Sequence, residues 1–192
     1  GCRTALQVRS VWLACWSSLL LAQLPLLQMS EAPHRNVIRV IDAGRELGID
    51  VLPRHFPQGA KTAQDAADAI GVDVGQIVKS LIFGVASDAD ELELVLAYVS
   101  GRNQLNEKLL AAAAGAEKCK RVDADAVRTS TGYPIGGVPP FGHTTQLRVF
   151  IDPDLLQYDE VWAAAGTWND VFAIEPNELV RASGGKVTDL RK

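Results

Sequence analysis

The hydrophobic positions of the chain recur at two spacings, one typical of helices and the other typical of strands. From Asn36 to Leu47 the apolar residues follow helical spacing, and Gly48 supplies a stop. Capping residues predict further helices: from Thr62, paired with Asp65, to Gly71; from Asn106 to Ala114; from Ala124 to about Ser130; and one that opens at Glu175-Pro176.

The remaining apolar runs have the length and composition of strands. Ile77–Phe83 and Leu92–Val99 are joined by a turn at Ser87–Asp90 that is too short for a parallel crossover, so they should form an antiparallel hairpin. Helices interspersed with at least one hairpin predict a mixed α+β domain, not a doubly wound sheet. Other strands are predicted at Ile49–Phe56, with Pro53 near an edge, and at Leu147–Ile151, Val161–Ala164 and Val171–Ile174.

Residues 1–28 differ in composition from the rest of the chain. Val11–Leu27 is almost wholly apolar and follows two arginines, as in a signal peptide, but no small-x-small cleavage site follows it. It is also short for a membrane span of about 20 residues. Met29 is the only methionine, and polar sequence begins directly after it. We therefore expect one domain over residues 29–192 and interpret residues 1–28 as a start-site artefact; a true signal or anchor is the alternative.

Charge and cysteine content narrow the function classes. The 192 residues carry a formal net charge of −4, and the first 28 contribute two arginines and no acid, so the remainder carries −6. An acidic body argues against binding along DNA, although it permits a local basic patch that docks one RNA end. The predicted domain holds one cysteine, Cys119, which fits a reducing, cytoplasmic compartment. No spacing resembles a metal or dinucleotide site, and we expect no cofactor and no membrane partner.

The stretch from Thr131 to His143 (Thr-Gly-Tyr-Pro-Ile-Gly-Gly-Val-Pro-Pro-Phe-Gly-His) has neither helical nor strand periodicity and is predicted to be a loop. Gly136 and Gly137 permit positive φ and leave backbone N–H groups uncovered, while two prolines stiffen the segment that follows. This combination indicates a backbone shaped to hold a carbonyl or phosphate oxygen. The alternative is an ordinary turn, because glycine and proline are also common turn residues.

Lys79 is the unusual residue of the predicted hairpin. It lies within an apolar strand, on the same face as Ile77, Leu81 and Phe83 by the period of two. A buried ammonium is unfavourable unless something pairs with it. Lys79 is therefore either a cation that binds an anion or polarises a carbonyl, or a lysine whose head group reaches water. Ser80 points to the opposite face, so we do not expect the two side chains to act together.

Several other residues have two interpretations each. His143 either orients a substrate or water or closes the loop at the surface. The segment Gly166-Thr167-Trp168-Asn169 is either a second pocket wall or a plain hairpin loop with a packed tryptophan. Gly101 has a turn as its simplest role. Neighbouring lysines could lower the pKa of Cys119, although we expect a non-catalytic cysteine.

Taken together, these motifs resemble the YbaK/ProX family of trans-editing aminoacyl-tRNA deacylases, relatives of which occur as an insertion in bacterial prolyl-tRNA synthetases. The matching segments occur in one order over about residues 36–190, and this order makes the resemblance specific. They are Thr62-Ala63-Gln64-Asp65-Ala66-Ala67, Gln76-Ile77-Val78-Lys79-Ser80-Leu81, Ser100-Gly101, Ser130 through His143, and Ala165-Gly166-Thr167-Trp168-Asn169.

The resemblance implies hydrolysis of the ester that joins a wrong amino acid to tRNA(Pro), on a mixed, largely antiparallel, barrel-like sheet with surrounding helices. The family's lysine falls on Lys79 and is implied to contact the aminoacyl-adenosine end. Its Gly-x-x-Pro loop falls on Gly136-Gly137-Val138-Pro139 and is implied to place backbone N–H groups at the substrate. The terminal ribose hydroxyl helps activate the attack, so no protein nucleophile and no metal are implied.

The implied partners are the acceptor end of an aminoacyl-tRNA and prolyl-tRNA synthetase. The implied catalytic residues are Lys79, Gly136 and Gly137. The residues implied to bind substrate are Thr62, Ser80, Gly101, Thr131, Gly132, Val138, Pro139, His143, Gly166 and Asn169.

The loop sequence bears on the amino acid that is removed. Cysteine-specific members resemble Gly-Gly-Ile-Ser-Pro-Leu-Gly, whereas this chain has Gly-Gly-Val-Pro-Pro-Phe-Gly-His. This difference argues against Cys-tRNA and leaves alanine, serine, threonine or a small non-protein amino acid open. The alternative function is a non-catalytic module that binds an aminoacyl-tRNA end or a synthetase. Intact Lys79 and loop glycines favour the enzyme, because a pure binder could lose either.

Overall fold

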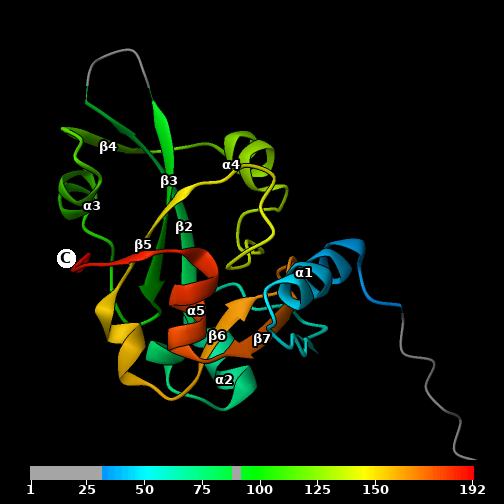
Figure 1. Ribbon diagram of the computed structural model, residues 1–192. Helices are drawn as coiled ribbons and strands as arrows, with labels where there is room; N and C mark the ends of the chain where they lie inside the picture. Colours follow the sequence, from blue (N-terminus) through cyan, green and yellow to red (C-terminus); the bar gives the residue numbers. More distant parts are fainter. Residues whose placement is uncertain (1–31, 88–91) are drawn as a thin grey trace, which may run out of the picture. The chain divides into compact units, whose positions relative to one another are not determined.

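A long antiparallel hairpin forms the centre of the molecule, with helices on both of its faces (Figure 1). The computed structural model describes residues 32–87 and 92–192. The expected leader at residues 1–28 and most of the expected turn at Ser87–Asp90 lie outside these residues. Pro33–Lys192 forms one compact unit.

The helices begin and end close to the capping residues that predict them. At the start of the second helix, Thr62 Oγ1 accepts a hydrogen bond from Asp65 N at 3.1 Å, and Asp65 Oδ2 accepts one from Thr62 N at 3.0 Å. This confirms the predicted capping box. The helices are α1 (Arg35–Glu46), α2 (Ala63–Ile70), α3 (Glu107–Ala114), α4 (Ala124–Thr131) and α5 (Pro176–Ser183), with short 3-10 helices η1 (Val74–Gln76) and η2 (Pro153–Gln157). Within the described residues, no helix has the length and apolar character needed to cross a membrane.

The strands form two sheets. In the larger, the order is β4 (Lys118–Arg121), β2 (Val78–Ala86), β3 (Glu93–Ser100), β5 (Arg148–Ile151) and β8 (Lys186–Val187). In the smaller, the order is β1 (Arg54–His55), β7 (Asp170–Ile174) and β6 (Val161–Ala164). The β3–β5 and β5–β8 pairs are parallel and the others antiparallel, so the mixed, largely antiparallel α+β fold is confirmed. An isolated parallel bridge between Ile77 and Trp162 links the sheets, and the described strands close no complete barrel.

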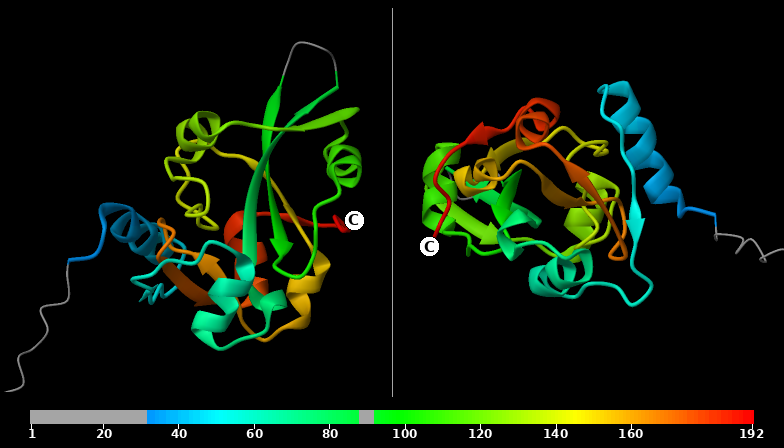
Figure 2. Two further views of the ribbon diagram at one scale, coloured as in Figure 1. Left: turned by 180° about the vertical axis from the view of Figure 1, so that it is seen from behind. Right: turned by 90° about the horizontal axis from the view of Figure 1, so that it is seen from below.

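Strand β2 separates two hydrophobic clusters because its side chains alternate between the two faces. Val78 and Ile82 face the main cluster, which includes Val127 of α4. Phe83 faces a second cluster that includes Leu110 of α3. Figure 1 shows α3 and α4 on opposite sides of the hairpin, and Figure 2 shows α1 and the C-terminus at opposite ends of the described unit.

Three strands differ from expectation. The predicted strand at Ile49–Phe56 is reduced to Arg54–His55, since Pro53 lacks the N–H that a ladder needs. Strand β4 was not predicted because three of its four residues are cations, and β8 because it is only two residues long. Both are edge strands, where exposed charged side chains discourage pairing with other chains.

Candidate functional site

Lys79 lies near the start of β2, where its side chain reaches the segment that follows β3. Its Nζ donates hydrogen bonds to Gly101 O, at 3.3 Å, and to Asn103 O. Both acceptors are backbone carbonyls, and no carboxylate of the described residues forms an ion pair with Lys79. Because an ammonium has three donors, one N–H of Lys79 remains available to a ligand.

The buried carboxylate of Asp152 holds the segment Ser100–Asn103, whose carbonyls anchor Lys79. Asn103 Nδ2 donates to Asp152 Oδ2 and to Asp154 Oδ2, both at 2.8 Å. Asp152 is fully buried and also accepts a hydrogen bond from Ser100 N at 3.2 Å. Burial lowers the pKa of Lys79 from its usual range, and the negative charge of Asp152 opposes this shift. The ammonium is therefore fixed in place while no contacting carboxylate neutralises it.

Gly101 and the start of α2 enclose the same end of the hairpin. A Cβ at Gly101 would lie 2.2 Å from Val74 O and 3.1 Å from Ala63 Cβ, so no larger residue fits there. Thr62 is adjacent to Ala63, but its hydroxyl is occupied by the cap of α2. Contact of either residue with substrate stays a prediction.

Ser80 faces away from Lys79, as the alternation predicts. It lies on the β2 face of the main hydrophobic cluster, between Val78 and Ile82, and Val138 of the glycine-proline loop belongs to the same cluster. Ser80 Oγ is buried and has no hydrogen-bond partner among the described residues. Leaving a buried hydroxyl unpaired costs about 1–3 kcal/mol. Contact of Ser80 with substrate stays a prediction.

The loop between α4 and β5 is held in a defined shape (Figure 1). Tyr98 Oη donates to Pro140 O at 3.0 Å, and His143 Nε2 donates to Pro139 O at 2.7 Å. Val138 and Phe141 are buried in the main cluster. A loop tied to the core at these points can preorganise its backbone groups for a ligand.

The two loop glycines differ in what their backbone N–H groups do. Gly136 is exposed with φ of 80°, and its N–H has no hydrogen-bond acceptor among the described residues. Gly137 N donates to Pro134 O at 3.0 Å, which closes a turn. The expectation of two uncovered N–H groups is therefore wrong for Gly137. A Cβ at Gly137 would lie 2.9 Å from Thr167 Cα and 3.0 Å from Gly166 O, so glycine is needed for close approach of the two segments.

The turn between β6 and β7 lies against this loop. Gly166 has φ of 98°, and its carbonyl oxygen accepts a hydrogen bond from Asn36 Nδ2 at 3.1 Å. Asn169 N donates to Thr167 Oγ1 at 3.1 Å. Trp168 is 61% exposed, so the packed tryptophan expected of a plain hairpin loop is wrong.

The ends of the loop have structural roles. Thr131 is fully buried; its hydroxyl donates to Val127 O at 2.7 Å and accepts from Tyr133 N at 3.1 Å. Gly132 ends α4 with φ of 80°, and its carbonyl accepts from Arg39 Nη1 at 3.3 Å. Burial lowers the pKa of His143, and its bond to the Pro139 carbonyl opposes this shift. These contacts shape the loop, and substrate contact by the same residues stays a prediction.

The predicted residues thus fall into two groups, which the bridge between Ile77 and Trp162 connects. Lys79, Gly101 and Thr62 lie at one end of the β2–β3 hairpin, and the other predicted residues, Ser80 apart, belong to the loop and the β6–β7 turn. Ile77, two residues before Lys79, bridges Trp162 of β6, and the carboxyl end of β6 leads into Gly166.

Sequence reasoning missed Asp152, and it gave Asn103 no role beyond a turn. Asp152 carried a usable signal, since an acid directly before a proline at a strand end is typical of a helix cap. The neighbouring lysines do not lower the pKa of Cys119: burial, with the charge of Glu107, raises it to about 11. Among residues 32–87 and 92–192, no cluster of histidine, cysteine or acidic side chains could hold a metal ion.

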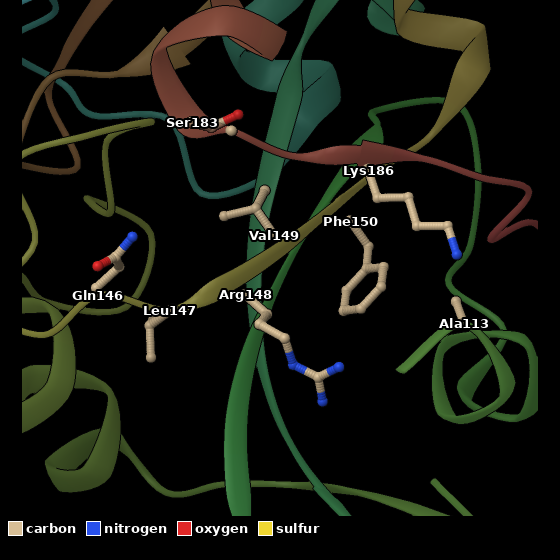
Figure 3. A pocket seen from close by; sticks show the side chains of 9 residues that line it. Ala113, Gln146, Leu147, Arg148, Val149, Phe150, Ser183 and Lys186 are labelled. Atoms are coloured by element: carbon tan, nitrogen blue, oxygen red, sulfur yellow. The ribbon is translucent and has the colours of Figure 1, made fainter. Parts of the chain in front are cut away.

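A surface depression of about 570 Å³ lies between the end of α3, β5 and the α5–β8 connection (Figure 3). Arg148, which lines it together with Lys186, donates to Glu93 through two 2.6 Å bonds and to Ala114 O at 3.0 Å. No predicted site residue lines this depression, so we place the candidate site at the hairpin end and the loop instead.

Comparisons with known proteins point to one family. The sequence profile of the aminoacyl-tRNA editing domain matches residues 57–182. The uncharacterized protein YwhH of Bacillus subtilis is 32% identical over 132 residues, which cover 69% of this chain and 81% of YwhH. EbsC of Enterococcus faecalis, a proposed Cys-tRNA(Pro)/Cys-tRNA(Cys) deacylase, is 24% identical over 129 residues, 67% of this chain and 76% of EbsC.

A solved structure agrees with these sequence relatives. A proposed trans-editing enzyme for prolyl tRNA synthetase superposes with a TM-score of 0.77 at 38% identity, covering 84% of this chain and 99% of the other. The profile match extends over well over half of the sequence and includes Lys79, the glycine-proline loop and the β6–β7 turn. The chain belongs to the aminoacyl-tRNA editing domain family.

Proposed function

We propose that this protein hydrolyses the ester between a wrong amino acid and the 3′ end of a tRNA, acting in trans. The observation that carries the proposal is the position of the Lys79 ammonium. It is anchored on the carbonyls of Gly101 and Asn103 and keeps one N–H for a ligand. A fixed cation that no carboxylate of the described residues contacts is suited to bind a phosphate or to stabilise charge that develops on an ester oxygen.

The proposed reaction needs no protein nucleophile. Water adds to the ester carbonyl carbon, the tetrahedral oxyanion collapses, and the bond to the ribose oxygen breaks, which releases the amino acid and the tRNA hydroxyl. Lys79 binds the aminoacyl-adenosine end, and the N–H of Gly136 donates to the oxyanion. The neighbouring ribose hydroxyl of the substrate orients the attacking water.

We further propose tRNA(Pro) carrying a small amino acid as the substrate. Two relatives support the tRNA identity, since one is a proposed trans-editing enzyme for prolyl tRNA synthetase and the other a proposed Cys-tRNA(Pro)/Cys-tRNA(Cys) deacylase. The loop residues Val138, Pro139 and Phe141 are buried, and they replace the Ile-Ser-x-Leu pattern of cysteine-specific members. Because the loop differs there, we propose alanine, serine or threonine rather than cysteine.

Deacylation of a panel of charged tRNA(Pro) species tests the proposal. Purified protein is incubated with tRNA(Pro) carrying alanine, serine, threonine, cysteine or proline, and the remaining ester is followed over time. We expect rapid loss of one small amino acid and protection of the proline ester, with Lys79→Ala as the matched inactive control. Equal rates for the wild type and Lys79→Ala on every ester would contradict the proposal. Tight binding without hydrolysis would instead support the alternative, a non-catalytic module.

A further inference from the structure

Trp168 is exposed and yet held in one orientation. Its indole Nε1–H donates to the backbone carbonyl of Ile135, in the glycine-proline loop. A Cβ built at Gly136 would lie 3.2 Å from Trp168 Cδ1 and 3.3 Å from Nε1, so the loop backbone covers the pyrrole side of the ring. Trp168 nevertheless remains 61% exposed. Most of the aromatic surface is therefore open to solvent beside the glycine that carries the uncovered N–H.

An exposed, oriented indole is suited to one kind of contact in particular. Bases stack on aromatic side chains with little regard to sequence, and a ring that is already fixed loses little entropy on binding. A tryptophan exposed without function would be expected to move freely, whereas this one is bonded to the loop.

Cations lie on the segment that contacts the same turn. Asn36 at the start of α1 donates to Gly166 O at 3.1 Å, two residues before Trp168. On the same helix, Arg39 donates to Gly132 O at the base of the loop, and its guanidinium lies 4.6 Å from the centre of the Tyr133 ring. Arg35 lies one turn before Arg39 and is also exposed. Arginines and an exposed aromatic ring on neighbouring segments are a usual combination for binding a single-stranded RNA end.

We infer that Trp168 stacks on the base of the terminal nucleotide of the tRNA acceptor end and thereby places the adjoining ester over Gly136. The inference rests on the proposed function for the identity of its ligand. Trp168 is a positioning residue in this scheme, since it contacts the base and not the reacting atoms. Protein docking at this ring is less favoured, because the exposed hydrophobic side chains of this region, Ile135 and Ile38, are accompanied on α1 by the exposed cations Arg35 and Arg39.

Binding of an RNA minihelix that carries no amino acid distinguishes stacking on the terminal base from protein docking. The probes are the tRNA(Pro) acceptor stem ending in CCA and the same RNA with an abasic ribose at its last position, each labelled at the 5′ end for fluorescence anisotropy. The proteins are the wild type, Trp168→Ala, Trp168→Phe and the neighbouring control Ile135→Ala. We expect Trp168→Ala to weaken binding of the intact RNA about tenfold or more, whereas Trp168→Phe and Ile135→Ala keep it within about threefold.

The abasic probe completes a double-mutant cycle. If the ring stacks on the terminal base, removal of the base weakens wild-type binding by a similar factor, and Trp168→Ala causes no further loss on the abasic RNA. Independent, multiplicative losses would overturn the inference, as would wild-type binding that does not depend on the terminal base. Unchanged RNA binding by Trp168→Ala together with lost binding of prolyl-tRNA synthetase would also overturn it, in favour of protein docking.

The hydrolysis assay keeps this inference separate from the proposed function. With mischarged tRNA, we expect Trp168→Ala to raise KM about tenfold and to change kcat little, because the ring contacts the base and not the reacting atoms. If the wild type hydrolyses the ester but the binding losses from Trp168→Ala and from the abasic RNA multiply, the stacking role is overturned and the proposed function stands. If the two binding losses are coupled but the wild type hydrolyses no ester, stacking is supported and the enzymatic proposal is contradicted.

Discussion

The ammonium of Lys79 donates a hydrogen bond to the backbone carbonyl oxygen of Asn103. Asn103 is held through its side chain by the buried carboxylate of Asp152, at 2.8 Å. Asn103 thus lies between the two charged groups: its backbone carbonyl contacts Lys79 and its side-chain amide contacts Asp152. Lys79 and Asp152 do not form a contacting ion pair. No carboxylate of the described residues contacts the ammonium, and the buried acid holds the residue that anchors it.

Replacement of Lys79 by alanine is expected to remove most deacylation and leave the fold intact. Loss of one charged contact to the transition state costs about 3 kcal/mol, or roughly a hundredfold in kcat/KM. The melting temperature should change little, since the two carbonyls that lose their donor lie in a partly exposed segment. Initial deacylation rates and thermal unfolding are measured together. Lys108→Ala, an exposed lysine of α3, is the control, and near wild-type rates in Lys79→Ala would show that Lys79 is structural.

The Tyr98 hydroxyl is expected to set the position of the glycine-proline loop. Tyr98 is fully buried, and its Oη donates to Pro140 O at 3.0 Å. In Tyr98→Phe the buried carbonyl of Pro140 loses this donor, at a cost of about 1–3 kcal/mol in the free energy of unfolding. We expect a lower urea midpoint and a severalfold drop in deacylation. Tyr158→Phe, which removes a 3.3 Å contact to Asp73 near the surface, should change neither, and equal effects of both variants would contradict this role for Tyr98.

Local signals in the sequence predict much of this fold. The capping box of Thr62 and Asp65 is present, and the hairpin pairs Lys79 with Val99 in antiparallel register. Such features depend on residues close together in the chain, where spacing and capping leave a pattern. Strand β4 left no pattern, because its lysines suit an exposed edge but lower its apparent strand propensity.

The candidate site was predictable in its residue types but not in its contacts. Glycines, prolines and a lysine in an apolar strand are visible in the sequence, whereas the anchor of Lys79 comes from a carbonyl 24 residues away. Gly137 shows the same limit. Its missing side chain suggested an uncovered N–H, but in the structure that N–H donates to Pro134 O in a turn. The space that a side chain would need is filled by the backbone of Thr167.

The partly buried imidazole of His143 should make stability depend on pH. Burial lowers its pKa below the usual 6.5, so the folded state favours the neutral ring that donates to Pro139 O. As pH falls through 6.5, the unfolded chain binds a proton that the folded chain resists, and the free energy of unfolding decreases. His143→Gln keeps an N–H donor and does not titrate. We expect urea unfolding to show wild-type stability falling relative to His143→Gln between about pH 7.5 and pH 5.5; a constant difference would contradict the assignment.

Removal of residues 1–28 is expected to leave folding and deacylation unchanged. The composition of the chain shifts at Met29, and Pro33–Lys192 forms a compact unit. Thermal unfolding and deacylation of the 29–192 protein are compared with those of the full chain. A deeper truncation that begins at residue 41 serves as the control, since it removes the buried side chains of Val37 and Val40 and should lower the melting temperature. Loss of soluble, folded protein in the 29–192 form would show that the leader is part of the fold.

The two loop glycines should respond differently to an added methyl group. At Gly137 a Cβ would meet backbone atoms of Gly166 and Thr167 at about 3 Å, so Gly137→Ala must separate the two segments and should reduce both stability and deacylation. At Gly136 the nearest atoms belong to the Trp168 side chain, which can shift. Gly136→Ala should therefore cost about 1 kcal/mol of stability, mainly from the positive φ.

Gly48 provides a matched control for that backbone strain. Its φ of 71° is close to the 80° of Gly136, and a Cβ there would meet nothing within 4 Å. Gly48→Ala and Gly136→Ala should thus lose similar stability. Only Gly136→Ala should lose deacylation, by about tenfold or more, because its added methyl group stands beside the N–H that we propose to donate to the oxyanion and against the Trp168 ring. Urea unfolding and initial deacylation rates are measured on both variants. Equal deacylation by Gly48→Ala and Gly136→Ala would show that Gly136 is an ordinary turn residue and that its N–H takes no part in the reaction.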